Sequence, residues 1–332
     1  LVNVAVLFGF KYILFIIENI NGLLAGINWE TIPLPDVSFP PGISFFTFLN
    51  ISYIVDVYRG SANRAKNPLH YGLYITFFPK MMMGPITLYS QFIGQIRNID
   101  KNRIQLYDGT KRFILGLGKK VLIADSVSTI VNSVFELPAQ HLTFSLVWVG
   151  AIAYSVQIYF DFSGYSDMAI GLGKIFGLHI PENFNFPYAA KSIKDFWKRW
   201  HITLAAWLQT YLFLPVAYAV LRRFKQPRVL RMKTENVAYY IGSFITMSLC
   251  GLWHGANWTF VVWGVYFGIL LIIEHAWLGK ILKKKCNRIV RVFYSNILIL
   301  IGWAIFRSDN IDYGLAYVKA MLGFGSGDGQ LF

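Results

Sequence analysis

Long stretches without charged residues divide this chain into segments of the length that membrane helices need. A helix rises about 1.5 Å per residue and the bilayer core is about 30 Å thick, so one crossing takes roughly 17–25 apolar residues. Lipid offers the backbone no hydrogen-bond partners, so we expect these stretches to be helical, in about eight to ten membrane-associated helices. The stretches free of Asp, Glu, Lys and Arg are Leu1–Phe10, Val37–Val55, Met81–Ile96, Leu142–Phe160, Trp200–Leu221, Asn236–Ile273 and Val292–Phe306.

The longest stretch, Asn236–Ile273, is long enough for two crossings with a bend between them. Two basic loops flank it, Arg222–Lys233 and Lys280–Arg291, each with six Lys or Arg residues. Cytoplasmic loops carry such an excess of positive charge. If both loops are cytoplasmic, the stretch must leave that side and return to it. His254 then lies at the bend, within Gly251–Asn257, whose glycines suit a tight change of direction.

A different path is expected for the stretch Trp200–Leu221, because basic segments flank it on both sides. Lys191–Arg199 precedes it and Arg222–Lys233 follows it. One complete crossing would place one of these segments outside the cell. We therefore predict that this segment is re-entrant or half-spanning, or lies along the cytoplasmic side, with a break at Pro215 and with His201 at its start.

The composition supports a membrane-embedded chain. Of the 332 residues, 55% are hydrophobic and 14% charged, with a mean hydropathy of +0.46, whereas soluble domains carry about 25% charged residues. The net charge of +14 gathers in short loops, which indicates membrane topology and contact with anionic lipid and speaks against a nucleic-acid partner. No linker or repeat divides residues 1–332, so we expect a single integral membrane domain. Because the chain begins inside an apolar run, we expect it to be a fragment that lacks an N-terminal region.

Two histidines stand out inside otherwise uncharged stretches. His254 and His201 are each the single Asp, Glu, Lys, Arg or His of their stretch, and tryptophans lie close to both in the sequence. Ionisable residues are costly within a membrane, so each needs a reason to be there. The residues alone leave two interpretations open. The histidines are structural and hydrogen-bonded within a helix bundle, or they are neutral bases in an apolar cavity.

Other polar positions give weaker indications. Asp161 and Asp167 flank a short string at the end of a predicted span, and we favour an anchoring role for both, with Asp161 kept as a candidate for the site. The glycines of Gly171–Gly173 favour close helix packing over phosphate binding. No pair of histidines has the spacing of zinc ligands, and no carboxylate adjoins His201 or His254 in the sequence, so we predict no metal site.

Several short strings form a pattern that runs along most of the chain. They are Ile51-Ser52-Tyr53 with Asp56, Tyr58, Arg59 and Gly60, then Met83–Ile86, Tyr159–Ala169, Pro181–Phe184, Asp195–Leu204, Gly251–Trp258 and Phe306–Asp309. In this order, the strings resemble the membrane-bound O-acyltransferases, and within that family the branch of bacterial alginate O-acetyltransferases. A set of strings in family order is far more specific than any one of them.

The resemblance implies an all-α integral membrane fold, with a ring of tilted helices and half-spanning segments around a central channel. It implies that His254 is catalytic and that His201 is a second functional histidine. Our candidates for the channel lining are Trp197, Trp200, Trp207, Trp253, Asn257, Trp258 and Asp161. The family commonly has Ser-Ser or Ser-Thr, Trp and Arg-Asp after the second histidine. Here the string is Ala205-Ala206-Trp207-Leu208-Gln209-Thr210, so we do not name alginate as the acceptor.

The activity implied by the resemblance is O-acyl transfer in the cytoplasmic membrane of a bacterium. An acetyl group from cytoplasmic acetyl-CoA would pass toward an envelope polysaccharide, directly or through an extracytoplasmic acetyltransferase-like partner protein. Beyond this donor, we expect no bound cofactor. Two alternatives stay open: D-alanyl transfer to teichoic acid, and a membrane transporter or channel, although the inverted repeats and paired broken helices typical of transporters are not found.

Overall fold

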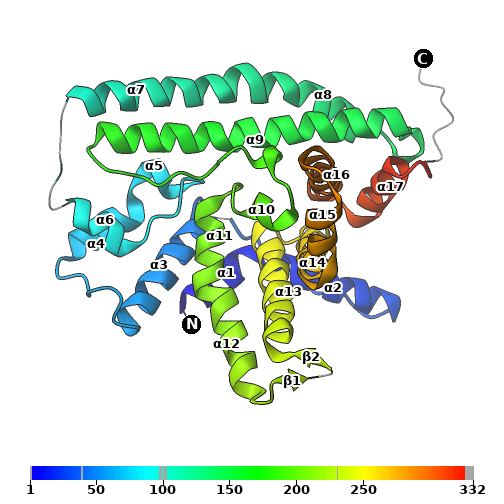
Figure 1. Cartoon of the computed structure of the whole chain (residues 1–332), viewed down its shortest axis with the longest axis horizontal. Helices are drawn as coiled ribbons and strands as arrows, with labels where there is room; N and C mark the ends of the chain where they lie inside the picture. The colour runs from blue at the N-terminus through cyan, green and yellow to red at the C-terminus, as the bar shows by residue number, and fades with distance from the viewer. Residues whose placement is uncertain (1, 39, 97–98, 100–102, 230, 326–332) are drawn as a thin grey trace.

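Helices make up nearly all of the described chain (Figure 1). The computed structural model describes residues 2–38, 40–96, 99, 103–229 and 231–325. The N-terminal helices are α1 (Val2–Lys11), α2 (Ile13–Gly26), α3 (Ile43–Tyr58), α4 (Pro68–Thr76), α5 (Phe78–Met81) and α6 (Tyr89–Ile96). The axes of α1 and α2 differ by 57°. This bend places Lys11 at the joint, where its side chain turns toward the interior of the molecule.

The longest helices form an antiparallel layer along one side of the molecule, at the top of Figure 1. They are α7 (Arg103–Gly118), which continues through a π-helical stretch (Lys119–Ala124) into α8 (Asp125–Phe135), and, after a 3-10 turn (Ala139–His141), α9 (Phe144–Ile175). Glycines bring the two backbones together. A Cβ on Gly116 would lie 2.6 Å from the carbonyl oxygen of Gly164, and one on Gly109 would lie 2.7 Å from that of Gly171. Small residues permit such approach between membrane helices, which confirms the packing role predicted for Gly171.

The middle of the chain passes through the interior before it forms another long helix. Its elements are a 3-10 turn (Pro187–Ala189), α10 (Ile193–Trp197), α11 (Ile202–Leu208), a π-helical stretch (Gln209–Phe213), α12 (Leu214–Arg223), β1 (Arg228–Val229) and β2 (Met232–Lys233). The segment Ile202–Arg223 is helical throughout and is long and apolar enough to cross a membrane. The break predicted at Pro215 is therefore wrong. Pro215 lies in the first turn of α12, directly after the π-helical stretch, which accommodates the missing N–H without ending the helix.

The bend predicted within Asn236–Ile273 is confirmed. α13 (Thr234–His254) and α14 (Trp258–Ile273) pack side by side and are joined by residues 255–257. The glycines act differently from the prediction. Gly255 has an extended backbone with a φ of −164°, whereas a Cβ on Gly251 would lie 2.1 Å from the carbonyl oxygen of Phe260. These glycines make room for close packing and do not supply an unusual turn.

The chain ends in helices that pack against α14 and α9. They are a π-helical stretch (Glu274–Leu278), α15 (Gly279–Lys285), α16 (Arg288–Arg307) and α17 (Ile311–Met321). Within the described residues, four helices are long and apolar enough to cross a membrane, or five if α1 and α2 form one bent span. The all-α, multispanning fold expected from the sequence is therefore confirmed. Within it, Met81–Ile96, an expected helical stretch, is interrupted by a loop at Gly84-Pro85.

Candidate active site

His254 is held among aromatic rings at the end of α13. It is the last residue of that helix. The centroid of its ring lies 4.9 Å from that of Trp253 and 5.2 Å from those of Trp263 and Phe306. Trp263 comes from α14 and Phe306 from α16, so three helices fix the position of the imidazole. No described residue forms a hydrogen bond with its ring nitrogens.

His201 is more deeply buried and is held by hydrogen bonds. It precedes α11 with a φ of +46°, in the left-handed region, and its side chain is 3% exposed. Its Nδ1 lies 3.1 Å from Oδ1 of Asn183. The ring of Phe162, from α9, meets the imidazole edge to face at 4.6 Å. Non-glycine residues rarely adopt such a backbone conformation unless the surroundings hold it, and such residues cluster at functional sites.

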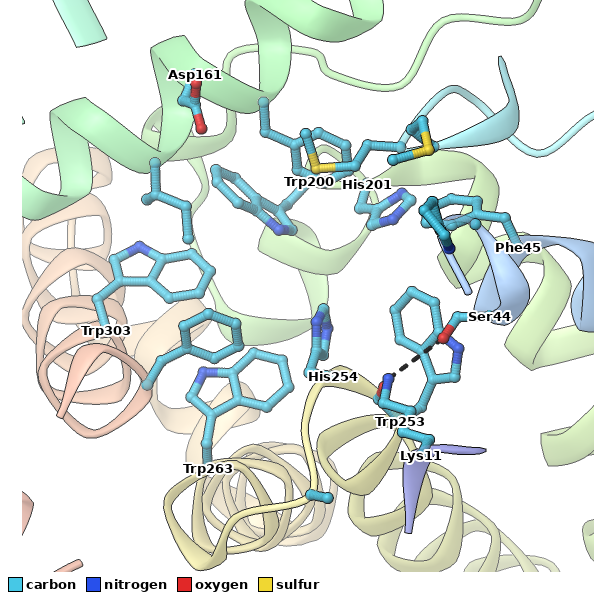
Figure 2. Close-up of a pocket in the computed structure, with 18 residues that line it drawn as sticks. Lys11, Ser44, Phe45, Asp161, Trp200, His201, Trp253, His254, Trp263 and Trp303 are labelled. Atoms are coloured by element: carbon cyan, nitrogen blue, oxygen red, sulfur yellow. Dashed lines mark hydrogen bonds between the residues drawn. The ribbon is translucent and has the colours of Figure 1, made fainter. Parts of the chain in front are cut away.

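The two histidines line the same cavity, of about 660 Å³. Figure 2 shows their rings on opposite walls, with Trp263 and Trp303 on one side and Ser44 and Phe45 on the other. The lining is mostly apolar and aromatic. Its residues are Lys11, Pro41, Gly42, Ser44, Phe45, Met82, Met83, Ile158, Asp161, Phe162, Trp200, His201, Trp253, His254, Ala256, Trp263, Trp303 and Phe306. We call this space the histidine cavity.

A second cavity, of about 570 Å³, lies on the other side of His201. His201 is the residue that the two cavities share. The lining of the second cavity includes Lys194 and Lys198 from the segment around α10, Cys250 from α13, and Gln209. We call it the lysine cavity. Since His201 walls both spaces, a group bound in either one can reach the same imidazole.

A third, strongly basic cavity of about 410 Å³ adjoins the lysine cavity. Lys194, Tyr239 and Leu271 line both of them. Its cationic lining residues are Lys191, Lys194, Lys280, Lys283 and Arg291. The basic segment around α10 therefore lies on the same face of the molecule as the loop Lys280–Arg291, as the charge pattern predicted.

A buried carboxylate holds the segment that leads to His201. Both carboxylate oxygens of Glu274 accept backbone N–H groups at the start of α10, from Ile193 at 2.8 Å and from Lys194 at 3.2 Å. Glu274 is 6% exposed. An anion is favourable at the N-terminal end of a helix, where N–H groups lack partners within the helix. The buried anion thus ties α10 to the helix that continues α14.

The structure brings some of the predicted lining residues together and leaves others apart. Trp200, Trp253 and Asp161 line the histidine cavity, and Trp197 lines the lysine cavity. The other three line neither. Trp207 packs against Phe48 and donates to its carbonyl oxygen at 3.2 Å, Asn257 caps α14, and Trp258 is half exposed and donates to Asn19 at 2.9 Å. For Asn257 and Trp258, closeness to His254 in sequence was misleading because the chain leaves the cavity after Ala256.

The anchoring role favoured for the two aspartates fits their contacts. Asp167 accepts from Arg112 at 2.8 Å and from Lys119 at 2.6 Å, which ties α9 to the helix beside it. Asp161 pairs with Lys120 at 2.7 Å, and it also lines the histidine cavity. Asp161 therefore combines both of the roles that the sequence left open.

Lys11 is a polar residue of the site that sequence reasoning missed. Its ammonium group donates to the backbone carbonyl oxygen of Trp253 and, at 3.3 Å, to the hydroxyl of Ser44. It thereby ties the joint between α1 and α2 to the residue before His254 (Figure 2). The sequence offered one signal, a lysine within an apolar helical stretch. Met83 and Phe306, also missed, lie in strings that carry the family resemblance.

A buried lysine supports the loop that carries Met82 and Met83 into the histidine cavity. Lys80, in α5, is 2% exposed and has no hydrogen-bond partner among the described residues. Its ammonium nitrogen lies 4.1 Å from the centre of the Tyr74 ring and 4.3 Å from that of Phe92. Burial lowers the pKa of Lys80 to about 7. Cation–π contacts offset only part of the cost of desolvating the charge.

This burial predicts that stability rises with pH. Between the folded pKa of Lys80, about 7, and the unfolded value of about 10.4, the unfolded chain binds the proton and the folded protein does not, so alkaline pH favours folding. Lys80→Met should remove this dependence and raise stability near pH 7 by about 2–4 kcal/mol. The measurement is the midpoint of thermal unfolding in detergent across this pH range. Lys66→Met, at an exposed lysine, is the control, and equal pH slopes for Lys80→Met and the parent protein would contradict the prediction.

The chain is similar in sequence to several known transferases. The chain is 38% identical to the probable alginate O-acetylase of Pseudomonas putida over 98% of its own length and 64% of that protein. It is 33% identical to the peptidoglycan O-acetyltransferase of Helicobacter pylori over 97% of its length and 63% of that protein. With the teichoic acid D-alanyltransferase of Bacillus subtilis, identity is 31% over 79% of the chain and 67% of that protein.

The chain spans less than two thirds of the length of the first two of these relatives. The model of the membrane-bound O-acyltransferase family matches residues 58–306, which include both histidines, α10 and the α13–α14 hairpin. This match covers well over half of a chain whose helices are those of a multi-pass membrane protein. The chain therefore belongs to the membrane-bound O-acyltransferase family.

Proposed function

We propose that the protein moves an acetyl group from a cytoplasmic thioester, acetyl-CoA, toward a polysaccharide outside the cytoplasmic membrane of a bacterium. The acceptor is the glycan itself or an extracytoplasmic acetyltransferase-like partner that modifies it. Relatives named for O-acetylation of alginate and of peptidoglycan support an acetyl group and a glycan acceptor. The observation that carries the proposal is the position of His201 between the lysine cavity and the histidine cavity.

The charges around the lysine cavity support its assignment to the donor. Lys194 and Lys198 line it, and the adjoining basic cavity adds Lys280, Lys283 and Arg291. Positive potential attracts a phosphate-bearing donor and raises its local concentration. These residues belong to segments whose charge is typical of the cytoplasmic side, where thioesters are made. The donor would enter from this side with its acyl end directed at His201.

The histidine cavity would then hold the acceptor hydroxyl. In the proposed step, the hydroxyl oxygen attacks the thioester carbonyl carbon while His254 takes the hydroxyl proton. The new C–O bond forms, the C–S bond breaks, and the sulfur leaves as a thiol after it receives that proton. The aromatic walls exclude water, which would otherwise hydrolyse the thioester. In this step His201 would orient or polarise the acyl carbonyl, or position His254.

Turnover of a labelled donor tests the proposal against its alternatives. Membranes that contain the protein and its partner should transfer the label of [acetyl-14C]acetyl-CoA to envelope glycan and release one thiol per acetyl group. Solute flux without thioester turnover would favour a transporter and overturn the proposal. Transfer of labelled D-alanine, with no transfer of acetyl, would favour the second candidate activity, which rests on the likeness to the teichoic acid D-alanyltransferase.

The donor assignment predicts a separable effect on KM. The double variant Lys194→Gln/Lys198→Gln should raise KM for the donor about tenfold, equivalent to about 1.4 kcal/mol, with little change in kcat, because neither lysine lines the histidine cavity. Initial rates at varied acetyl-CoA concentration give both constants. Lys225→Gln is the matched control, since Lys225 belongs to a neighbouring basic loop and lines none of the three cavities. An equal rise in KM for the Lys225→Gln control would mean that the loss of any nearby positive charge weakens donor binding, and it would contradict the assignment of the donor to the lysine cavity.

A further inference from the structure

Asn183 is the centre of a buried hydrogen-bond network beneath His201. Asn183 is 1% exposed and Thr203 is 8% exposed. Besides the contact with Nδ1 of His201, Oδ1 of Asn183 accepts from the backbone N–H of Thr203 at 3.2 Å and from its hydroxyl at 2.9 Å. The amide nitrogen of Asn183 donates to Ser166 at 3.3 Å. Three elements thus meet at this one side chain: α9, α11 and the loop before α10.

The directions of these hydrogen bonds are fixed by their chemistry. The backbone N–H of Thr203 can only donate, so the atom of Asn183 that faces it must be the amide oxygen. The hydroxyl of Thr203 accepts from the backbone N–H of Ile86 at 3.0 Å, which leaves its own hydrogen for Asn183. If the amide were flipped, its NH₂ group would face the N–H of Thr203, donor against donor. The oxygen therefore faces His201.

The oxygen of Asn183 in turn selects the tautomer of His201. A lone pair on Nδ1 facing the amide oxygen would leave two buried acceptors without a hydrogen between them, which is unfavourable. Nδ1 therefore carries the hydrogen and donates it to Asn183. In the neutral ring, Nε2 then carries a lone pair. Such a nitrogen accepts a proton or a hydrogen bond and cannot polarise an acyl carbonyl.

We propose that Asn183 is a positioning residue that holds His201 as the Nδ1–H tautomer and so makes Nε2 a proton acceptor at the junction of the two cavities. The inference rests on the proposed function only in linking this acceptor to acyl transfer. Of the roles proposed above for His201, it excludes polarisation of the acyl carbonyl. A histidine oriented through Nδ1 by a third group is the arrangement that activates nucleophiles in many acyl-transfer enzymes.

The backbone around His201 serves the same purpose. The main-chain carbonyl oxygen of Asn183 accepts from the N–H of Ile202 at 3.0 Å. On the other side of His201, the ring of Trp200 packs against that of Trp303, with 4.9 Å between the ring centroids. Both chain neighbours of His201, whose backbone is left-handed, are therefore held in place. One residue, Asn183, bonds to the ring of His201 and to the backbone that follows it. An unfavourable backbone conformation is thus kept at the residue whose imidazole it orients.

An amide holds this ring in place without adding charge. The charged or titratable groups that line the same spaces are Lys11, Asp161 and His254 in the histidine cavity and Lys194, Lys198, Tyr239 and Cys250 in the lysine cavity. An aspartate at position 183 would accept the same three hydrogen bonds but would stabilise a protonated imidazole. The neutral amide leaves Nε2 free to take a proton. Asn183→Asp therefore keeps the geometry and changes the electrostatics.

The pH profile of acyl transfer separates this role from simple packing. Asn183→Asp should stabilise the protonated ring of His201, which is inactive as an acceptor. The acid limb of the pH profile of kcat should therefore move to higher pH by about one unit or more. Asn183→Ala should lower kcat about 10–100-fold with a smaller change in KM. Asn185→Asp makes the same chemical change two residues away at an exposed side chain. A role in packing alone would lower activity equally at every pH, and an unshifted acid limb in Asn183→Asp would overturn the proposal.

A spectroscopic readout makes the inference independent of turnover. The readout is the NMR spectrum of protein labelled with ¹⁵N-histidine and reconstituted in nanodiscs. The signals that are absent from the His201→Gln variant belong to His201, and they should show a protonated Nδ1 and an unprotonated Nε2. Asn183→Leu, which packs a similar volume without an acceptor, should weaken this preference. Signals of an Nε2–H tautomer in the parent protein would overturn the inference whether or not the protein transfers acetyl groups. The expected tautomer without acetyl transfer would leave the positioning intact and refute only the proposed function.

Discussion

Replacing His254 by alanine should lower acyl transfer by a factor of about 10²–10⁴, the usual contribution of a general base. The imidazole has no hydrogen-bond partner among the described residues, so its removal breaks no buried polar network. Its loss leaves a small space among Trp253, Trp263 and Phe306. The amount of protein in the membrane should therefore change little. Acetyl content of the envelope glycan, normalised to the protein level, measures the effect.

His179→Ala is the matched control for this experiment. The side chain of His179 is exposed, and the hydrogen bonds between His179 and Gln95 involve only backbone atoms of the histidine. The control should keep full activity. Normal acetylation by His254→Ala at a normal protein level would remove His254 from the reaction. A loss of both variants from the membrane would instead point to a structural role for histidines in this chain.

The second large effect concerns the crossing of α13 and α14. A Cβ on Gly264 would lie 2.3 Å from the backbone carbonyl oxygen of Met247. Backbone atoms cannot rotate away, so Gly264→Ala must push the two helices apart. Overpacking of this kind costs about 1–3 kcal/mol or more. The variant should lose most of its folded protein, and whatever folds should be inactive, because the same hairpin carries His254 and Trp263.

Gly268→Ala tests whether the effect is local to this crossing. Gly268 lies one helical turn further along α14, and the nearest atoms to a Cβ there are at 3.4 Å, an ordinary contact distance. Folding should be unchanged or slightly better, because alanine is the better helix former. Folded yield by size-exclusion chromatography of the detergent extract compares the two variants. Equal yields would show that the hairpin opens more easily than its packing implies.

The sequence predicted those parts of the fold that depend on local properties. Charge and apolar length are local, so the bend at His254 and the basic faces were predicted from runs of residues. Pro215 was misjudged because its neighbours decide whether a proline breaks a helix, and here a π-helical stretch precedes it. The helix expected over Met81–Ile96 was wrong for a similar reason, because an uncharged run can fold as a loop and a short helix.

The two histidines of the site were predicted, but most of their surroundings were not. Spacing cannot tell that Asn183 lies under His201, because eighteen positions and one short helix separate them along the chain. Nor can it tell that Lys11 reaches the carbonyl of Trp253 from a helix 242 positions away. Contacts of this kind depend on how helices cross. Closeness in sequence to a histidine was a poor guide to which aromatic residues line the cavity, as the half-exposed position of Trp258 shows.

The contact between Lys11 and the Trp253 carbonyl has a consequence for how members of this family diverge. The family match begins at residue 58, yet Lys11, Ser44 and Phe45 form part of the wall around His254. If His254 acts as proposed, the matched segment supplies the base, and a segment that precedes it supplies part of the enclosure. Exchange of these first helices between homologous proteins would alter acceptor choice while the imidazole pair stays intact.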